Sequence, residues 1–111
     1  MPDDPWGAEP VGPVPAPEWP SREYLASHFR THRRRLGLRT VEAYVASARD
    51  TIEIGTYFEY RALDSNEPRV GYYDAHSGRF TALNADESTI LTHYRCSESY
   101  VAESLPGSTY A

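Results

Sequence analysis

Apolar residues recur with helical spacing in a segment that runs from Ser21 to Leu36. Successive residues of a helix are turned by about 100°, so residues three, four and seven positions apart share one side. The apolar side of this segment carries, in chain order, Leu25, Phe29, His32 and Leu36, with His28 at its margin. Ser21 is a suitable N-cap and Gly37 a suitable terminator, so the pattern predicts a helix between them.

A second helix is predicted between Thr40 and Ile54, where a similar spacing follows. The apolar positions are Val41, Tyr44, Val45, Ala48 and Ile52. Thr40 can accept a hydrogen bond from the first turn, and Gly55 can end the helix.

After Gly55 the chain becomes rich in aromatic and β-branched residues, which indicates strands. Four strands are predicted, over 56–63, 69–75, 79–84 and 89–95, with turns between them and one helical turn near Tyr100. On the fourth strand we expect Ile90, Thr92 and Tyr94 on one face and Leu91 and His93 on the other. The expected fold is α+β, with two N-terminal helices packed on a four-stranded antiparallel meander.

Residues 1–20 differ from the rest of the chain in composition. They hold seven of the nine prolines and four acidic residues without a basic one, so we expect an extended or disordered leader followed by a single domain over residues 21–111. The leader contains two tryptophans, Trp6 and Trp19. One of them is expected to pack on the domain, with docking to a partner as the alternative.

Positive charge is concentrated in the first helix and just beyond it. Residues 22–39 hold six arginines and one acid, a net charge of +5, whereas residues 40–111 hold five arginines and eleven acids, a net charge of −6. Guanidinium groups bind phosphate in a fork, and imidazoles exchange protons near neutral pH. This pattern suits a phosphate-bearing substrate, but composition alone favours the alternative, a solvated basic helix face with one buried histidine.

Several classes of site are disfavoured by the same residues. The chain has no lysine, which excludes a P-loop. The pair His28-x-x-x-His32 has the spacing of two zinc ligands, but it lacks the intervening glutamate of a metalloprotease and a clear third ligand, so no metal or other cofactor is expected. No signal sequence or membrane-spanning run is evident, and a single cysteine, Cys96, fits a reducing compartment such as the cytoplasm.

Polar residues also gather on the predicted strands, where Thr92, His93 and Tyr94 stand together. Tyrosines such as Tyr73 offer aromatic surfaces on which RNA bases stack. Packing in the core is the alternative role for these rings.

The order of these motifs resembles that of the small ribonuclease domains of bacterial toxins, from contact-dependent and other polymorphic systems, which share a fold with barnase, EndoU and the tRNA-cleaving colicins. The resemblance covers residues 22–95 and rests on short motifs. These are Leu25-x-x-His28-Phe29-x-x-His32, Tyr44 and Ala48, Gly71-Tyr72-Tyr73-Asp74, Ser77-Gly78-x-Phe80-Thr81, Asp86, and Ile90-x-Thr92-x-Tyr94. The chain departs from the family in having Arg33 where glycine is common and in lacking the family's lysine.

The resemblance implies a metal-independent endoribonuclease that cleaves RNA, with tRNA as one candidate, by attack of the ribose 2′-hydroxyl. His28 or His32 would be the general base, and the other histidine or His93 the acid. The implied catalytic set is His28, His32, Thr92, His93, Tyr94 and Arg69, where Arg69 or Arg79 stands in for the lysine. The implied substrate-binding set is Arg33, Arg34, Arg35, Arg39 and Tyr73.

A toxin of this type would need a cognate inhibitor, immunity or antitoxin protein in its producing cell. Two other functions remain open on the sequence alone. One is a non-catalytic domain of the same fold that binds a protein or nucleic acid, and the other is a small metal-binding protein.

Overall fold

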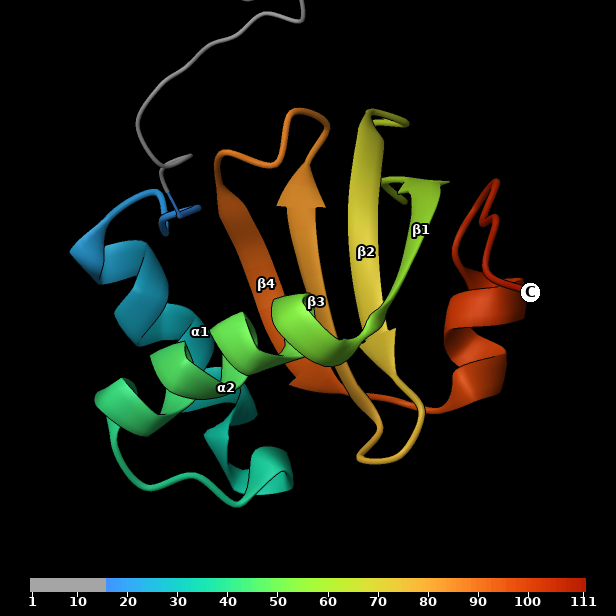
Figure 1. Ribbon diagram of the computed structural model, residues 1–111. Helices are drawn as coiled ribbons and strands as arrows, with labels where there is room; N and C mark the ends of the chain where they lie inside the picture. The colour runs from blue at the N-terminus through green and yellow to red at the C-terminus, as the bar shows by residue number, and fades with distance from the viewer. Residues whose placement is uncertain (1–15) are drawn as a thin grey trace, which may run out of the picture.

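The computed structural model describes residues 16–111 and contains two α-helices, four strands and a short C-terminal helix (Figure 1). In chain order the elements are α1 (Arg22–Leu36), α2 (Val41–Ile54), β1 (Thr56–Arg61), β2 (Pro68–Asp74), β3 (Arg79–Asn84), β4 (Ile90–Arg95) and the π-helix η1 (Tyr100–Ser104). The α+β fold class predicted from the sequence is confirmed. Trp6 and the first fifteen positions of the predicted leader lie outside the described residues.

Both helices begin and end at the residues that the sequence predicts. The side chains of Ser21 and Thr40 accept hydrogen bonds from the backbone N–H groups of Tyr24 and Ala43, at 3.0 and 3.1 Å. Gly37 ends α1 in the left-handed conformation, with φ of 71°, which glycine adopts without steric cost. The caps therefore fix where α1 stops and where α2 begins.

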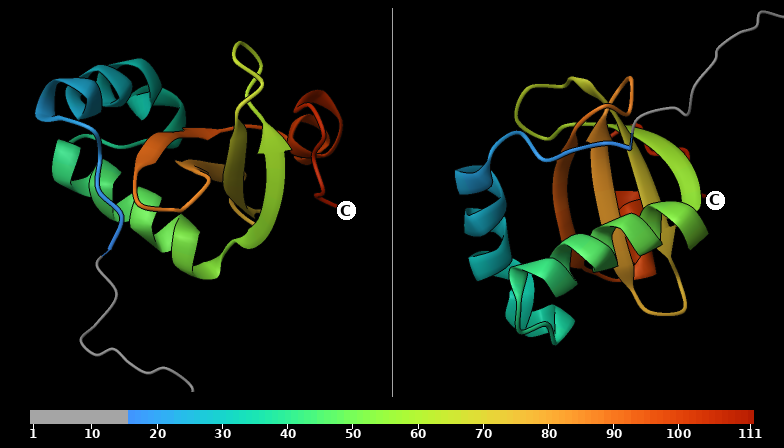
Figure 2. Two further views of the ribbon diagram at one scale, coloured as in Figure 1. Left: turned by 90° about the horizontal axis from the view of Figure 1, so that it is seen from above. Right: turned by 60° about the vertical axis from the view of Figure 1, so that its left-hand side comes forward.

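The sheet is an antiparallel meander in the order β1-β2-β3-β4. Its two faces are covered differently (Figure 2). Helix α2 lies across one face, over β2 and β3, whereas α1 packs beside β4. This arrangement puts the polar residues of α1 next to the last strand, since α1 and β4 make the largest helix–sheet contact of the described chain.

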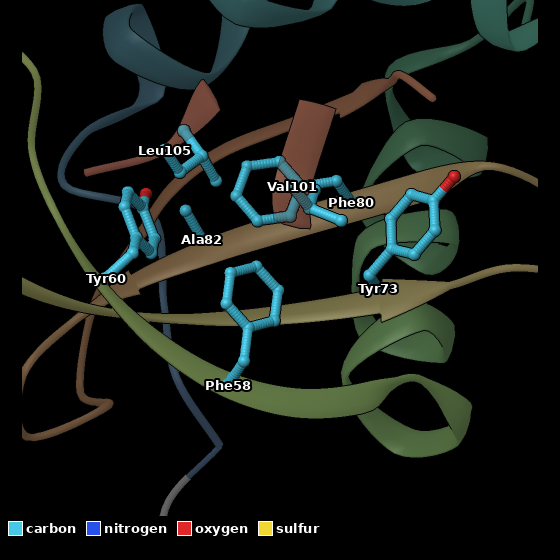
Figure 3. Packing of buried hydrophobic residues seen from close by; sticks show 7 residues of the cluster. All are labelled: Phe58, Tyr60, Tyr73, Phe80, Ala82, Val101 and Leu105. Atoms are coloured by element: carbon cyan, nitrogen blue, oxygen red, sulfur yellow. The ribbon is translucent and has the colours of Figure 1, made fainter. Parts of the chain in front are cut away.

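The second face of the sheet carries an aromatic core that η1 covers (Figure 3). Its buried members are Phe58, Tyr60, Tyr73, Phe80, Ala82, Val101 and Leu105. Gly71 of β2 leaves room for two of these rings, because a Cβ at this position would lie 2.5 Å from the Phe58 ring and 2.8 Å from the Phe80 ring. The helical turn predicted near Tyr100 thus closes the core.

Both edges of the sheet have backbone partners. At the β4 edge, Glu18 forms a parallel bridge with Thr89, and its carbonyl accepts from the N–H of Ile90 at 2.9 Å. At the β1 edge, the N–H of Thr109 donates to Glu59 O and that of Arg61 to Pro106 O, at 2.9 and 2.8 Å. Residues 16–20 therefore lie against the domain.

A bulge in β4 overturns the expected division of its side chains between the two faces. Ala82 pairs with Thr92 and Leu83 pairs with Ile90, so Leu91 is an extra residue between them. As a result Ile90 faces α2, while Thr92 and Tyr94 face the aromatic core with Ala82. The predicted sharing of one face by Ile90, Thr92 and Tyr94 is wrong for this reason.

Candidate functional site

The side of α1 that faces β4 carries the rings of Tyr24, His28 and His32. The rings of Tyr24 and His28 stack at a centroid distance of 4.3 Å, and the rings of His28 and His32 are 5.9 Å apart. The hydroxyl of Tyr24 donates to Leu91 O at 2.5 Å, which ties α1 to β4 at the bulge. Because a carbonyl only accepts, the 3.1 Å contact from His28 Nδ1 to Tyr24 O places a proton on Nδ1 and leaves Nε2 as the basic nitrogen of neutral His28.

His32 meets β4 at Tyr94, with 5.1 Å between the ring centroids. The hydroxyl of Tyr94 lies 3.2 Å from that of Tyr100 of η1. A cavity of about 380 Å³ opens here, which we call the His32 cavity. It is lined by His32, Arg35, Tyr94, Arg95, Cys96, Ser97 and Tyr100.

A second cavity, of about 280 Å³, lies on the other side of Tyr94 and Tyr100, and we call it the Arg69 cavity. It is lined by Tyr60, Ala62, Leu63, Asp64, Arg69, Thr92, Tyr94, Tyr100 and Leu105. The Nε atom of Arg69 is buried and has no hydrogen-bond partner among the described residues. An unpaired buried donor costs free energy, so an anion in this cavity would satisfy it.

Burial and neighbouring side chains determine the protonation of His32 and Tyr94. Burial, together with repulsion from the imidazole of His28, lowers the pKa of His32, so His32 is neutral and basic at pH 7. Burial and the hydrogen bond with Tyr100 raise the pKa of Tyr94, so its hydroxyl keeps its proton and can donate. A base and a neutral hydrogen-bond donor are thus adjacent.

His93 lies on the opposite face of the sheet and is fully buried beneath α2. Its Nδ1 lies 2.8 Å from Thr81 Oγ1 and 3.1 Å from Phe80 O, and its Nε2 lies 2.8 Å from Ser47 Oγ. The Phe80 carbonyl requires a proton on Nδ1, so Nε2 accepts from the Ser47 hydroxyl. A side chain held in this way cannot reach a substrate, and the acid role expected for His93 does not fit its position.

Burial is also the main reason that the pKa of His93 falls to about 3. The guanidinium of Arg79 contributes, since its Nη1 donates to Ser47 Oγ at 2.8 Å and its Nη2 to Leu36 O at 3.3 Å. Arg79 is therefore part of the packing between α2 and the sheet. Of the two arginines expected to replace the family's lysine, only Arg69 lines a cavity with Thr92.

The residues expected to bind substrate are dispersed. Arg35 lines the His32 cavity, whereas Arg34 and Arg39 are exposed and line neither the His32 cavity nor the Arg69 cavity. Arg33 donates to Leu38 O at 3.3 Å and lies over the Phe29 ring. Tyr73 is buried in the aromatic core, where its hydroxyl donates to Cys96 O at 2.9 Å, so it offers no stacking surface.

Four residues of the site's surroundings were not predicted as site residues: Trp19, Tyr24, Tyr100 and Arg95. Trp19 packs among Tyr24, His28 and Tyr44, with ring centroids 5.5 to 6.3 Å away, as expected for one leader tryptophan. Tyr24 shares the i, i+4 spacing of His28 and His32, which is the signal in the sequence that could have identified it. Arg95 reaches the site as the last residue of β4, and Tyr100 reaches it as the first residue of η1.

The described residues contain neither a cluster of metal ligands nor a membrane-spanning helix. Among residues 16–111, no group of three or more His, Cys, Asp or Glu side chains is placed to hold a metal ion. Over the same residues, no helix has the length and apolar character needed to cross a membrane.

Comparison with protein-family models, curated proteins and solved structures finds no match for this chain.

Proposed function

We propose that the protein is a metal-independent endoribonuclease of bacterial toxin type, acting at the His32 and Arg69 cavities. The observation that carries the proposal is the position of His32 against Tyr94, at the wall that the two cavities share. A base on one side of this wall suits proton abstraction from a ribose hydroxyl. An arginine with a buried, unpartnered Nε among the described residues, on the other side, suits stabilisation of charge on a phosphodiester.

In the proposed reaction, neutral His32 takes the proton of the ribose 2′-hydroxyl, and O2′ attacks the adjacent phosphorus. The bond from phosphorus to O5′ breaks, and protonated His28 gives its proton to the departing O5′. The products are a 2′,3′-cyclic phosphate and a 5′-hydroxyl. The base role is assigned to His32 because its lowered pKa favours the base form, and His28 takes the remaining role of acid.

Arg69 and Thr92 would stabilise the charge that develops on the phosphorane oxygens. Both line the Arg69 cavity, and the buried Nε of Arg69 is a donor that has no hydrogen-bond partner among the described residues. Removing one such donor typically slows a reaction by about 100- to 1000-fold. Tyr94 and Tyr100 would add two hydroxyl groups beside the same oxygens.

The proposal is tested by incubating the purified protein with total RNA and with tRNA in the presence of EDTA. We expect cleavage that yields cyclic phosphate ends, lost in His28→Ala and His32→Ala. His76→Ala is the matched control, because His76 is exposed in the turn between β2 and β3. An oligonucleotide with 2′-deoxyribose at the cut site should stay intact. Intact RNA after incubation with the parent protein would refute the proposal.

The second candidate is a non-catalytic binding domain of the same fold. The net charge of −6 over residues 40–111 favours it, because this charge disfavours nucleic acid over most of the chain. On this alternative, His28→Ala leaves function unchanged and Arg33→Glu abolishes partner binding. Under the ribonuclease proposal, an acidic inhibitor protein would instead cover the basic side of α1.

A further inference from the structure

A cavity of about 390 Å³ adjoins the His32 cavity, and two arginines frame it. We call it the Arg35–Arg95 cavity; it is lined by Arg35, Arg95, Cys96 and Ser97. All four residues also line the His32 cavity, so the two spaces are continuous. The Arg69 cavity shares only Tyr94 and Tyr100 with the His32 cavity. The Arg69 cavity and the Arg35–Arg95 cavity therefore each adjoin the His32 cavity through different residues.

The two guanidinium groups come from separate elements that the fold holds together. Arg35 is in the last turn of α1, and Arg95 is the last residue of β4. Gly78, with φ of 76°, lies at the turn before β3, and a Cβ there would be 3.5 Å from the side chain of Arg95. The carbonyl of Gly78 accepts from the N–H of Cys96 at 2.9 Å, so the chain direction after Arg95 is fixed.

The charge of this cavity suits an anion. Among the described residues no carboxylate lines it, and both arginines that line it carry positive charge that an anion would balance. Burial raises the pKa of the Cys96 thiol to about 12, so at pH 7 the thiol adds no negative charge. The Ser97 hydroxyl is a further donor at the same wall.

Building on the proposed ribonuclease function, we propose that the Arg35–Arg95 cavity binds the phosphate of a nucleotide next to the cut, on a single strand of RNA. The scissile phosphate would lie at the wall between the His32 and Arg69 cavities. His32, Tyr94 and Tyr100 line the His32 cavity but not the Arg35–Arg95 cavity, so a phosphate held in the Arg35–Arg95 cavity is a different one along the strand.

The proposal predicts that one additional phosphate on a minimal substrate improves its cleavage. The test compares a dinucleoside monophosphate with the same compound carrying a terminal phosphate at its 5′ end or at its 3′ end. For the parent protein we expect kcat/KM to rise about tenfold with the terminal phosphate at one of the two ends. In Arg35→Gln and Arg95→Gln this gain, measured as the ratio of kcat/KM for the two compounds with the same variant, should disappear.

Arg30→Gln is the matched control, because Arg30 is an exposed arginine of the same helix and lines neither cavity. It should keep the full gain from the terminal phosphate. A gain that is absent in the parent protein, or that survives in both cavity variants, would overturn the subsite. Failure of the parent protein to cleave any RNA would overturn the proposed function instead.

Binding gives a measurement that does not depend on cleavage. A fluorescent single-stranded RNA with 2′-O-methyl groups cannot react, and its affinity can be measured by polarisation over a range of salt concentrations. For single strands the slope of log K against log salt is about 0.7 per phosphate contact. We expect the slope of the Arg35→Gln/Arg95→Gln double variant to be shallower by about this amount, and that of Arg30→Gln to match the parent. Equal slopes in all three proteins would refute the subsite.

Discussion

The imidazole of His32 lies against the ring of Tyr94, with 5.1 Å between centroids and 33° between the ring planes. The two residues come from α1 and β4, and their contact joins the basic helix to the wall shared by two cavities. Packing against Tyr94 helps to bury His32, and this burial is the first reason that its pKa is low. The environment of His32 can therefore be changed from both sides, at Tyr94 and at His28.

We expect the pKa of His32 to rise in Tyr94→Leu and in His28→Gln. The first variant exposes the imidazole to water, and the second removes the repulsion from the neighbouring imidazole. NMR titration of the histidine ring protons measures both effects directly. His76→Gln, in an exposed turn, should leave the His32 titration unchanged. An unaltered pKa in both test variants would contradict this account of the site.

Stability at acid pH should depend strongly on His93. Its pKa is about 3 in the folded protein and 6.5 when unperturbed, so the unfolded chain binds the proton first. The stabilisation is complete above pH 6.5 and is lost as the pH falls from 6.5 towards 3, by a total on the order of 5 kcal/mol. Urea unfolding at several pH values should show a smaller loss over this range in His93→Gln than in the parent protein.

The same variant separates a structural role of His93 from a catalytic one. His93→Gln should unfold at lower urea concentration at pH 7, because Ser47 and Thr81 lose their imidazole partner. Its RNA cleavage per folded molecule should stay close to that of the parent. A loss of activity comparable to that of His32→Ala, in protein shown to be folded, would restore His93 to the catalytic set.

Most of the fold follows from local signals in the sequence. The helical period from Leu25 to Leu36, the caps at Ser21 and Thr40, and the turn glycines are short-range features, and the structure confirms the elements that they predict. The alternation of side chains in β3 likewise puts Phe80 and Ala82 together in the aromatic core. These predictions succeed because each depends on residues only a few positions apart.

The site was predicted less completely, because its assembly depends on distant contacts. The bulge at Leu91 moves the residues that follow it in β4 to the opposite faces from those predicted by alternation from Ile90. The strand contains no glycine or proline that would indicate a bulge. It puts His93 beneath α2 and Thr92 with Arg69, which strict alternation from Ile90 would not do. Arg95 enters the site only because the end of β4 lies beside the last turn of α1.

Gly71 should be among the positions most sensitive to a single methyl group. In Gly71→Ala the added Cβ would meet the Phe58 and Phe80 rings at 2.5 and 2.8 Å, and overpacking of this kind costs about 1–3 kcal/mol. Thermal or urea unfolding measures the loss. The same substitution in a Phe58→Leu background should cost less, because the smaller side chain gives way. Equal costs in both backgrounds would show that the aromatic pair is not the cause.

Trp19 should stabilise the domain although it precedes α1. Its ring packs on Tyr24, His28 and Tyr44, so Trp19→Ala should lower the free energy of unfolding by about 2 kcal/mol. Its Nε1 is buried and has no hydrogen-bond partner among the described residues, which costs free energy in the parent protein. Trp19→Phe removes this N–H and keeps an aromatic ring, so urea unfolding should show a clearly smaller loss than for Trp19→Ala. If Trp19→Ala is as stable as the parent, the contact of residues 16–20 with the domain contributes nothing to folding, and the domain begins at Ser21.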